Sequence, residues 1–308
     1  MKKVHLISVQ EPFMFDLALA LRNKEYEVSA SGIGLSDSQI TRLQDAGVLC
    51  EENGWFPSVV QKELHCVVLG AQADQSNPEL EKAKELGLYI VSIPEFIFLR
   101  TKNKTRFVVS GSKDKRAILS IMAFVLKKQR ITFDYALMRD VPEFDSRVHL
   151  SFEARVALIE GDEHLTSILD KRFKLEYYRP HVAVVSNIDW IESSEYPTFE
   201  SYIEMYRDFF NLIERDGKLI YSEKDATLKS LASQVREDIT SIPFETHATT
   251  LDENGRTCLD TRYGLVPVYS EDPLFVEYLN AARLACRQIG VNDKAFYSAI
   301  AEYKQTLS

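Results

Sequence analysis

Segments typical of strands and helices alternate through the first third of the chain, and this alternation restricts the possible folds more than any other feature. The apolar run 4–9 predicts a buried strand, and Phe13, Leu17 and Leu21 then recur at helical spacing. Further strands are expected at 26–29, 66–70 and 88–91, with helices at 36–46, 78–86 and 94–99. Such alternation predicts an α/β protein with mostly parallel, doubly wound sheets.

A second alternation begins after the polar stretch 102–105. Strands are expected at 107–110, 155–160, 181–187 and 217–221, and helices at 116–128, 199–213, 226–233, 274–289 and 293–303. We therefore predict two domains, a Rossmann-like domain at 1–102 and a second α/β domain at 103–308.

Charge and apolar patterning exclude several functions. The formal net charge of −9 opposes binding to nucleic acid. The apolar run 118–126 is shorter than the roughly 20 residues of a membrane span, and the first apolar run is too short for a signal peptide, so a cytoplasmic protein is expected. The four cysteines form no metal-binding or disulfide pattern: Cys50, Cys66, Cys258 and Cys286.

The turn 111–116, Gly-Ser-Lys-Asp-Lys-Arg, joins a predicted strand to a predicted helix. Backbone N–H groups at such a helix start bind anions, and Lys113, Lys115 and Arg116 could assist them. The alternative is a solvated basic turn. Only 12 of the 308 residues are glycine, about 4% against a usual level of about 7%. This shortage argues against a working phosphate site, because close approach of the backbone to phosphate depends on glycine.

Several strings in the second half resemble the Mur ligases, the ATP-dependent ligases of peptidoglycan peptides. The strongest are LIEGDE at 158–163 and DKRFK at 170–174, which together are similar to IEADEYDTAFFDKRSKF in the muropeptide-recycling ligases. The string RPHVAVVSNID at 179–189 is similar to their RP followed by a strand that ends in NNLE or NIE. Residues 76–80 and the aromatic run Tyr196, Phe199, Tyr202 and Phe209 match in the same order. The nearest branch is that of the UDP-N-acetylmuramate ligases.

The resemblance implies a UDP-binding type of domain at 1–102 and a P-loop, ATPase-type central domain at 103–308. Because the chain ends there, we expect the family's C-terminal ligase domain to be absent. The family's first turn, GIGGxGMS, corresponds to residues 8–15. Here its glycines are gone, Pro12 offers no N–H and Glu11 would repel a diphosphate.

The family's phosphate loop, GTHGKTTT, corresponds to residues 111–118. Asp114 stands where the family has a glycine, and Arg116 where it has the threonine that binds Mg²⁺. The resemblance still implies a degenerate phosphate site with Asn187 beside it, made of Gly111, Ser112, Lys113 and Lys115. Glu160 matches a metal-binding carboxylate, so Lys115 and Glu160 are the vestiges of catalysis.

Further positions of the resembled sites are also altered. Glu192 replaces the family's metal-placing histidine. The family's adenine-binding string falls near three bulky residues that could fill the pocket: Leu274, Phe275 and Tyr278. Asp170, Arg172 and Lys174 keep the family's pattern, and their alternative interpretation is a surface ion-pair cluster.

Three hypotheses remain open. The first is a catalytically inactive homologue, without a cofactor, that acts in binding or regulation. The second is a diverged ligase that uses ATP and Mg²⁺ and needs a separate C-terminal subunit. The third is a module that binds a nucleotide-sugar or muropeptide without turnover. The sequence identifies no protein partner and no oligomeric state.

Overall fold

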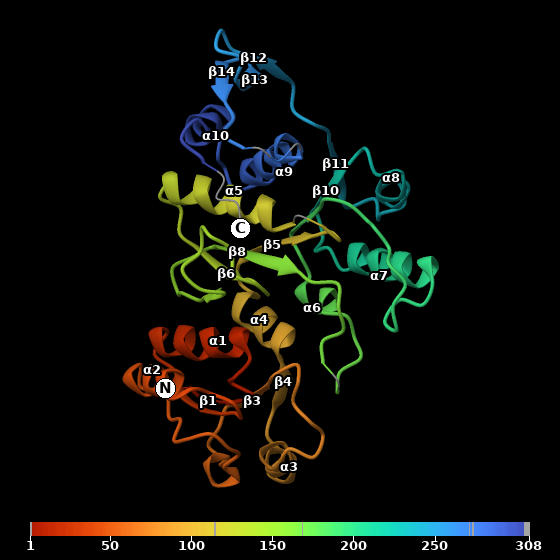
Figure 1. The fold of residues 1–308 in the computed structure, drawn as a ribbon. Helices are drawn as coiled ribbons and strands as arrows, with labels where there is room; N and C mark the ends of the chain where they lie inside the picture. Colours follow the sequence, from red (N-terminus) through yellow and green to blue (C-terminus); the bar gives the residue numbers. More distant parts are fainter. Residues whose placement is uncertain (1, 114, 168, 271, 273, 305–308) are drawn as a thin grey trace.

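The computed structural model describes residues 2–113, 115–167, 169–270, 272 and 274–304, and it contains two large, mostly parallel sheets (Figure 1). The first sheet has four parallel strands in the order β2-β1-β3-β4. Its strands are β1 (Lys3–Ile7), β2 (Glu27–Ser31), β3 (Cys66–Leu69) and β4 (Ile90–Ser92). The helical segments around it are α1 (Pro12–Asn23), α2 (Asp37–Asp45), η1 (Pro57–Val59), α3 (Pro78–Glu85) and α4 (Ile93–Thr101).

Local signals explain where these helices begin and end. Pro12 occupies the first turn of α1, where its missing N–H costs nothing. Ser36 and Gln39 form a capping box at the start of α2, and Gly47 follows that helix with a φ of +79°. Asn77 caps α3 through its side chain. The predicted helices and strands of the first sheet are therefore present, with small shifts at their ends.

The second sheet has seven strands in the order β11-β10-β9-β5-β8-β6-β7. Among its described strands only β7 runs antiparallel to its neighbour. The strands are β5 (Thr105–Ser110), β6 (Phe133–Ala136), β7 (Val148–His149), β8 (Val156–Gly161), β9 (Val182–Val185), β10 (Lys218–Ser222) and β11 (Thr240–Phe244). Its helices are α5 (Lys115–Lys128), α6 (Leu175–Tyr178), α7 (Phe199–Asn211), α8 (Ala226–Ala232), α9 (Phe275–Gln288) and α10 (Asp293–Ile300).

The predicted α/β class with mostly parallel sheets is confirmed, with one addition. A small antiparallel sheet lies beyond α9 and α10, at the top of Figure 1. Its strands are β12 (Thr249–Leu251), β13 (Thr257–Thr261) and β14 (Gly264–Pro267). Helix α5 is buried on most sides, as its sequence predicts, because it packs between the seven-stranded sheet and α9.

The junction between the two large sheets is tightly bonded. One hydrophobic cluster contains Leu6 and Phe96 from the first sheet's layers as well as Val108 and Tyr206 from the second. The guanidinium of Arg106, whose residue is 1% exposed, donates to backbone carbonyls on both sides of the junction and pairs with a carboxylate. Its partners are the carbonyls of Thr101, Lys102, Lys104, Tyr178 and Arg179 and the side chain of Glu214.

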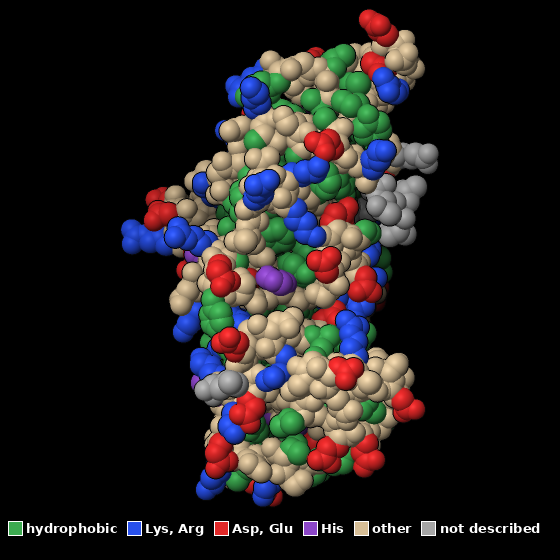
Figure 2. Space-filling view, turned by 90° about the vertical axis from the view of Figure 1, so that its left-hand side faces the viewer, with side chains coloured by type: hydrophobic (Ala, Val, Ile, Leu, Met, Phe, Trp, Pro, Cys, Tyr) green, Lys and Arg blue, Asp and Glu red, His purple; other side chains and the backbone are tan. Residues whose placement is uncertain are grey.

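The surface is mixed in charge. Figure 2 shows lysine and arginine interspersed with aspartate and glutamate on the face that it presents. Over the described residues, no helix is both long enough and apolar enough to cross a membrane.

Candidate functional site

The predicted phosphate loop follows the carboxyl end of β5 and leads into α5. Gly111 has a φ of +137°, and a Cβ at this position would lie 2.1 Å from Ser186 Oγ, so only glycine fits. Lys115 turns back over the loop, and its Nζ donates to the Gly111 carbonyl at 3.1 Å. Asp114, the acidic replacement expected to face phosphate, lies outside the described residues.

The loop is bonded to the segment that follows β9. Ser112 N–H donates to the Asn187 carbonyl at 3.4 Å, and Lys113 N–H donates to Asn187 Oδ1 at 3.2 Å. Ser186 Oγ donates to the Lys113 carbonyl at 2.9 Å, and Asp189 N–H donates to Ser112 Oγ at 2.9 Å. Two N–H groups that the resemblance directs at phosphate therefore point at Asn187, which closes the loop.

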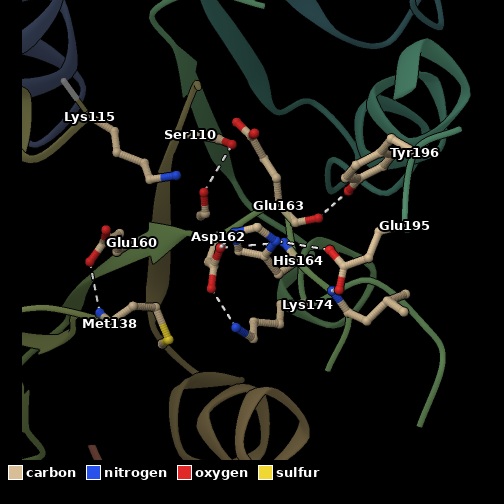
Figure 3. Close-up of polar contacts among 12 residues, drawn as sticks. Ser110, Lys115, Met138, Glu160, Asp162, Glu163, His164, Lys174, Glu195 and Tyr196 are labelled. Carbon is tan, nitrogen blue, oxygen red and sulfur yellow. Dashed lines mark hydrogen bonds and ion pairs between the residues drawn. The ribbon is translucent and has the colours of Figure 1, made fainter. Parts of the chain in front are cut away.

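Glu160 lies beside this loop, at the end of β8 (Figure 3). It is 3% exposed, and its Oε2 accepts a hydrogen bond from Met138 N–H at 2.7 Å. Burial raises the pKa of the Glu160 carboxyl, while the nearby Lys115 ammonium opposes that shift. The structure thus brings together the two vestigial residues Lys115 and Glu160.

The other acids of this strand end have partners of their own. Asp162 pairs with the Lys174 ammonium. Burial alone would raise the pKa of Asp162, but Lys174, together with His164 and Lys115, outweighs it, and the pKa lies below its usual value. Glu163 accepts hydrogen bonds from the hydroxyls of Tyr202 at 2.7 Å and Tyr206 at 2.5 Å. In the described part of the chain, no three acidic, histidine or cysteine side chains converge in a way that could hold a metal ion.

The first turn sends one of its own side chains, Glu11, to the loop that follows β3. The Glu11 carboxylate accepts hydrogen bonds from Ala71 N–H at 3.0 Å and from Gln72 N–H at 2.9 Å. A Cβ on Gly70 would lie 2.4 Å from Glu11 Oε1, so the carboxylate lies directly against the loop after β3. Burial raises the pKa of Glu11, and the two backbone hydrogen bonds oppose the shift. This carboxylate occupies a backbone cradle of the kind that binds anions.

A cavity of about 440 Å³ opens next to the phosphate loop. Lys113 and Asn187 line one side, Lys224 lies on another, and Leu274 and Tyr278 come from the start of α9. Two of the three residues expected to fill an adenine pocket therefore line this cavity. The third, Phe275, is 2% exposed and packs in the core.

Asp170, Arg172 and Lys174, which keep the family's pattern in the sequence, do not form one cluster in the structure. Asp170 and Arg172 form an ion pair at 3.0 Å, as expected for a surface ion-pair cluster, whereas Lys174 pairs with Asp162.

The contact of Glu11 with the loop after β3 could not be predicted from the sequence. Its partners lie 60 and 61 residues away in the chain, so no local sequence pattern indicates them.

The fold and this loop define an α/β protein of the phosphate-loop type. No family model matches the sequence. The UDP-N-acetylmuramate–L-alanyl-gamma-D-glutamyl-meso-2,6-diaminoheptandioate ligase of Escherichia coli is 21% identical over 74% of this chain and 50% of its own length. The UDP-N-acetylmuramate–L-alanine ligase of Paenarthrobacter aurescens is 29% identical over 75% of this chain and 48% of its own length.

Among solved structures, the chain is similar to the UDP-N-acetylmuramate:L-alanyl-gamma-D-glutamyl-meso-diaminopimelate ligase from Neisseria meningitides. The TM-score is 0.84 at 19% identity, and the match covers 100% of both chains. This likeness shows the fold. Together with the sequence matches, it makes the chain a homologue of the Mur ligases over their N-terminal and central domains. The chain spans about half the length of the curated relatives it matches.

Proposed function

We propose that this chain is a Mur-ligase-type protein of peptidoglycan precursor synthesis or recycling that no longer performs ATP-dependent ligation and acts in the cytoplasm by binding. The observation that carries the proposal is the closed phosphate loop. The N–H groups of Ser112 and Lys113 donate hydrogen bonds to Asn187, and the Lys115 ammonium donates one to the Gly111 carbonyl of the loop itself. A triphosphate would have to displace each of these bonds before it could bind.

Two further features support the loss of ligation. Arg116 stands where the family has the hydroxyl that binds Mg²⁺, and it has no side-chain oxygen to offer. Glu160 is buried and bonded to Met138, and among the described residues no group of three or more His, Cys, Asp or Glu side chains could hold a metal ion. These residues do not fit a Mg²⁺-bound triphosphate, and we derive no catalytic step through one.

The domain boundary at 102/103 is part of the same proposal. It falls between the end of α4 and the start of β5, so residues 1–102 carry the four-stranded sheet and residues 103–308 carry the seven-stranded and three-stranded sheets. The ligand of the binding function would be a nucleotide-sugar, a muropeptide or a protein partner.

A specific observation favours the alternative, a diverged ligase completed by a separate C-terminal subunit. The cavity of about 440 Å³ beside the loop is within the size range of small-molecule sites. Lys113 and Lys224 line it and pair with Asp189 at 2.7 Å and Glu277 at 2.9 Å, so both lysines would have to leave these carboxylates to bind a phosphate. A nucleotide could enter this cavity if the loop opened.

Ligand-dependent thermal unfolding distinguishes the two functions. A ligand at 100 times its Kd adds about 2.7 kcal/mol to the free energy of unfolding. We expect no such stabilisation from Mg-ATP. A clear stabilisation that is lost in Lys115→Ala but kept in Lys128→Ala, a matched change at the far end of α5, would contradict the proposal.

Restoring the family's residues is the complementary experiment. The double variant Asp114→Gly, Arg116→Thr returns the glycine and the hydroxyl of the phosphate loop. If only the loop prevents nucleotide binding, this variant should be stabilised by Mg-ATP while the unmodified chain is not. Titration with UDP-N-acetylmuramate, in the same assay, tests the nucleotide-sugar as a ligand.

A further inference from the structure

A second cavity, of about 500 Å³, lies in the first sheet's layer and shares no residue with the phosphate loop or with the Glu11 turn. Its floor is the edge strand β2, extended by residues 48–50: Leu49 N–H donates to the Val28 carbonyl, and Ala30 N–H donates to the Leu49 carbonyl. The segment around η1 covers it. Pockets of this size hold small organic molecules.

The lining is mostly apolar. Val48 and Cys50 are buried at the floor, and Phe56, Val59 and Leu64 face them from the covering segment. The hydrophobic effect therefore favours an apolar body in this space.

A buried polar network holds the covering segment at a fixed distance from the sheet. His5 Nδ1 lies 2.8 Å from Ser29 Oγ, and His5 Nε2 lies 3.2 Å from Glu79 Oε2. The other oxygen of Glu79 accepts a hydrogen bond from Phe56 N–H at 2.6 Å. His5 and Glu79 are both 0% exposed, so this network is insulated from solvent and keeps the cavity formed without a ligand.

Ser31 supplies a buried polar group that has no partner among the described residues. It lines the cavity and is 1% exposed, and its Oγ has no hydrogen-bond partner among the described residues. A buried hydroxyl without a partner is costly, by about 1–3 kcal/mol, and a ligand atom in the cavity could satisfy it. Ser29 Oγ bonds to His5, and a hydroxyl can take part in more than one hydrogen bond, so Ser29 retains further bonding capacity beside it.

The charge at the cavity selects against anions. Lys3 pairs with Glu27 at 2.9 Å, which neutralises the one cationic side chain among the described residues of the lining. Glu51 and Glu63 add two carboxylates. A nucleotide or another phosphorylated ligand would be repelled here.

We propose that this cavity is a binding site for an uncharged, mainly apolar small molecule that makes a hydrogen bond to Ser31. The proposal does not depend on whether the phosphate loop binds a nucleotide. Nile red, which is neutral and carries a carbonyl acceptor, is the probe, and the anionic dye 1-anilinonaphthalene-8-sulfonate is its comparison. Nile red fluorescence should rise and saturate at one equivalent of the intact chain, whereas the anionic dye should bind at least tenfold more weakly.

Two variants locate the bound probe. Val59→Trp fills the cavity and should abolish saturable Nile red binding, whereas Val235→Trp, a partly buried position elsewhere, should not. Ser31→Ala removes the hydroxyl without adding volume and should weaken Nile red binding several-fold. Its thermal midpoint should not fall, because the hydroxyl has no partner to lose.

The charge of the lining is tested by the double variant Glu51→Gln, Glu63→Gln, which should narrow the difference between the two dyes. The proposal is overturned by three results: no saturable Nile red binding, binding that survives both Val59→Trp and Ser31→Ala, or equal binding of the anionic dye to the unmodified chain. Should Val59→Trp fail to fold, Ser31→Ala alone decides the location.

Discussion

Replacing Glu11 should open an anion site at the loop after β3, opposite the first turn. In Glu11→Ala the N–H groups of Ala71 and Gln72 lose their carboxylate acceptor and are left directed at an empty cradle. Pyrophosphate should then bind there, because such backbone cradles attract anions. The unmodified chain should not bind it, since its own carboxylate occupies the cradle.

The magnitude follows from two opposing contributions. Each hydrogen bond to a charged acceptor contributes about 1.5–3 kcal/mol, but the raised pKa of Glu11 indicates that burial of the charge costs more than these bonds return. We therefore expect Glu11→Ala to lower the free energy of unfolding by only about 1–2 kcal/mol. Glu11→Gln keeps one acceptor and removes the charge, so it should be as stable as the unmodified chain or more stable at pH 7.

The assay is urea unfolding with and without pyrophosphate. At 100 times its Kd, pyrophosphate should add about 2.7 kcal/mol to the stability of Glu11→Ala. Glu81→Ala removes the same charge from an exposed position of α3, and pyrophosphate should not increase its stability. Equal stabilisation of the unmodified chain and Glu11→Ala would refute the reasoning, as would a Glu11→Ala variant that is indifferent to pyrophosphate.

Two other positions give predictions about stability. Lys104→Met should lower the free energy of unfolding by about 3–5 kcal/mol in urea titrations, because it leaves Asp134 buried without the ammonium that lies 2.5 Å away. Burial alone would raise the pKa of Asp134, but hydrogen bonds from neighbouring side chains, Lys104 among them, keep it below its usual value. When the pKa of a carboxyl is lower in the folded than in the unfolded protein, the carboxylate stabilises the fold above about pH 4, and this stability is lost in acid. The difference in stability between the unmodified chain and Lys104→Met should therefore shrink as the pH of the titration falls from 6 to 2. Gly111→Ala should lower the urea midpoint more than Gly34→Ala, because both have positive φ but only at Gly111 would the new Cβ meet Ser186; equal losses would contradict this account.

Much of the fold follows from periodicity, and the exceptions have a physical reason. Most strands and helices with a buried stripe were predicted within a few residues, among them α1, whose Phe13, Leu17 and Leu21 are buried. Strand β6, whose four residues are all buried, was not predicted. Strand β12 was not predicted because all three of its residues are exposed, so no alternation of buried and exposed positions marks it. Strand β7 has two residues and α6 has four, too few for any period to emerge.

The candidate site likewise has a part that could be predicted from the sequence and a part that could not. The resemblance placed Asn187 beside Gly111 and Lys115. These residues lie close together because β5 and β9 are neighbouring parallel strands that end at the same edge of the sheet. The use of Asn187 to bond the loop closed could not be predicted, since it depends on side-chain directions across two strand ends. The binding of the Glu11 carboxylate to the loop after β3 depends equally on a contact between distant segments.

The bonds of Arg106 bear on how the molecule moves. Its guanidinium holds the carbonyls of Thr101 and Lys102, the residues where a hinge between the two large sheets would have to bend. Bending there would break bonds that the buried cation cannot replace with water. The two sheets should therefore unfold in one cooperative transition and turn little relative to each other, so that any change that opens the phosphate loop must come from the loop itself.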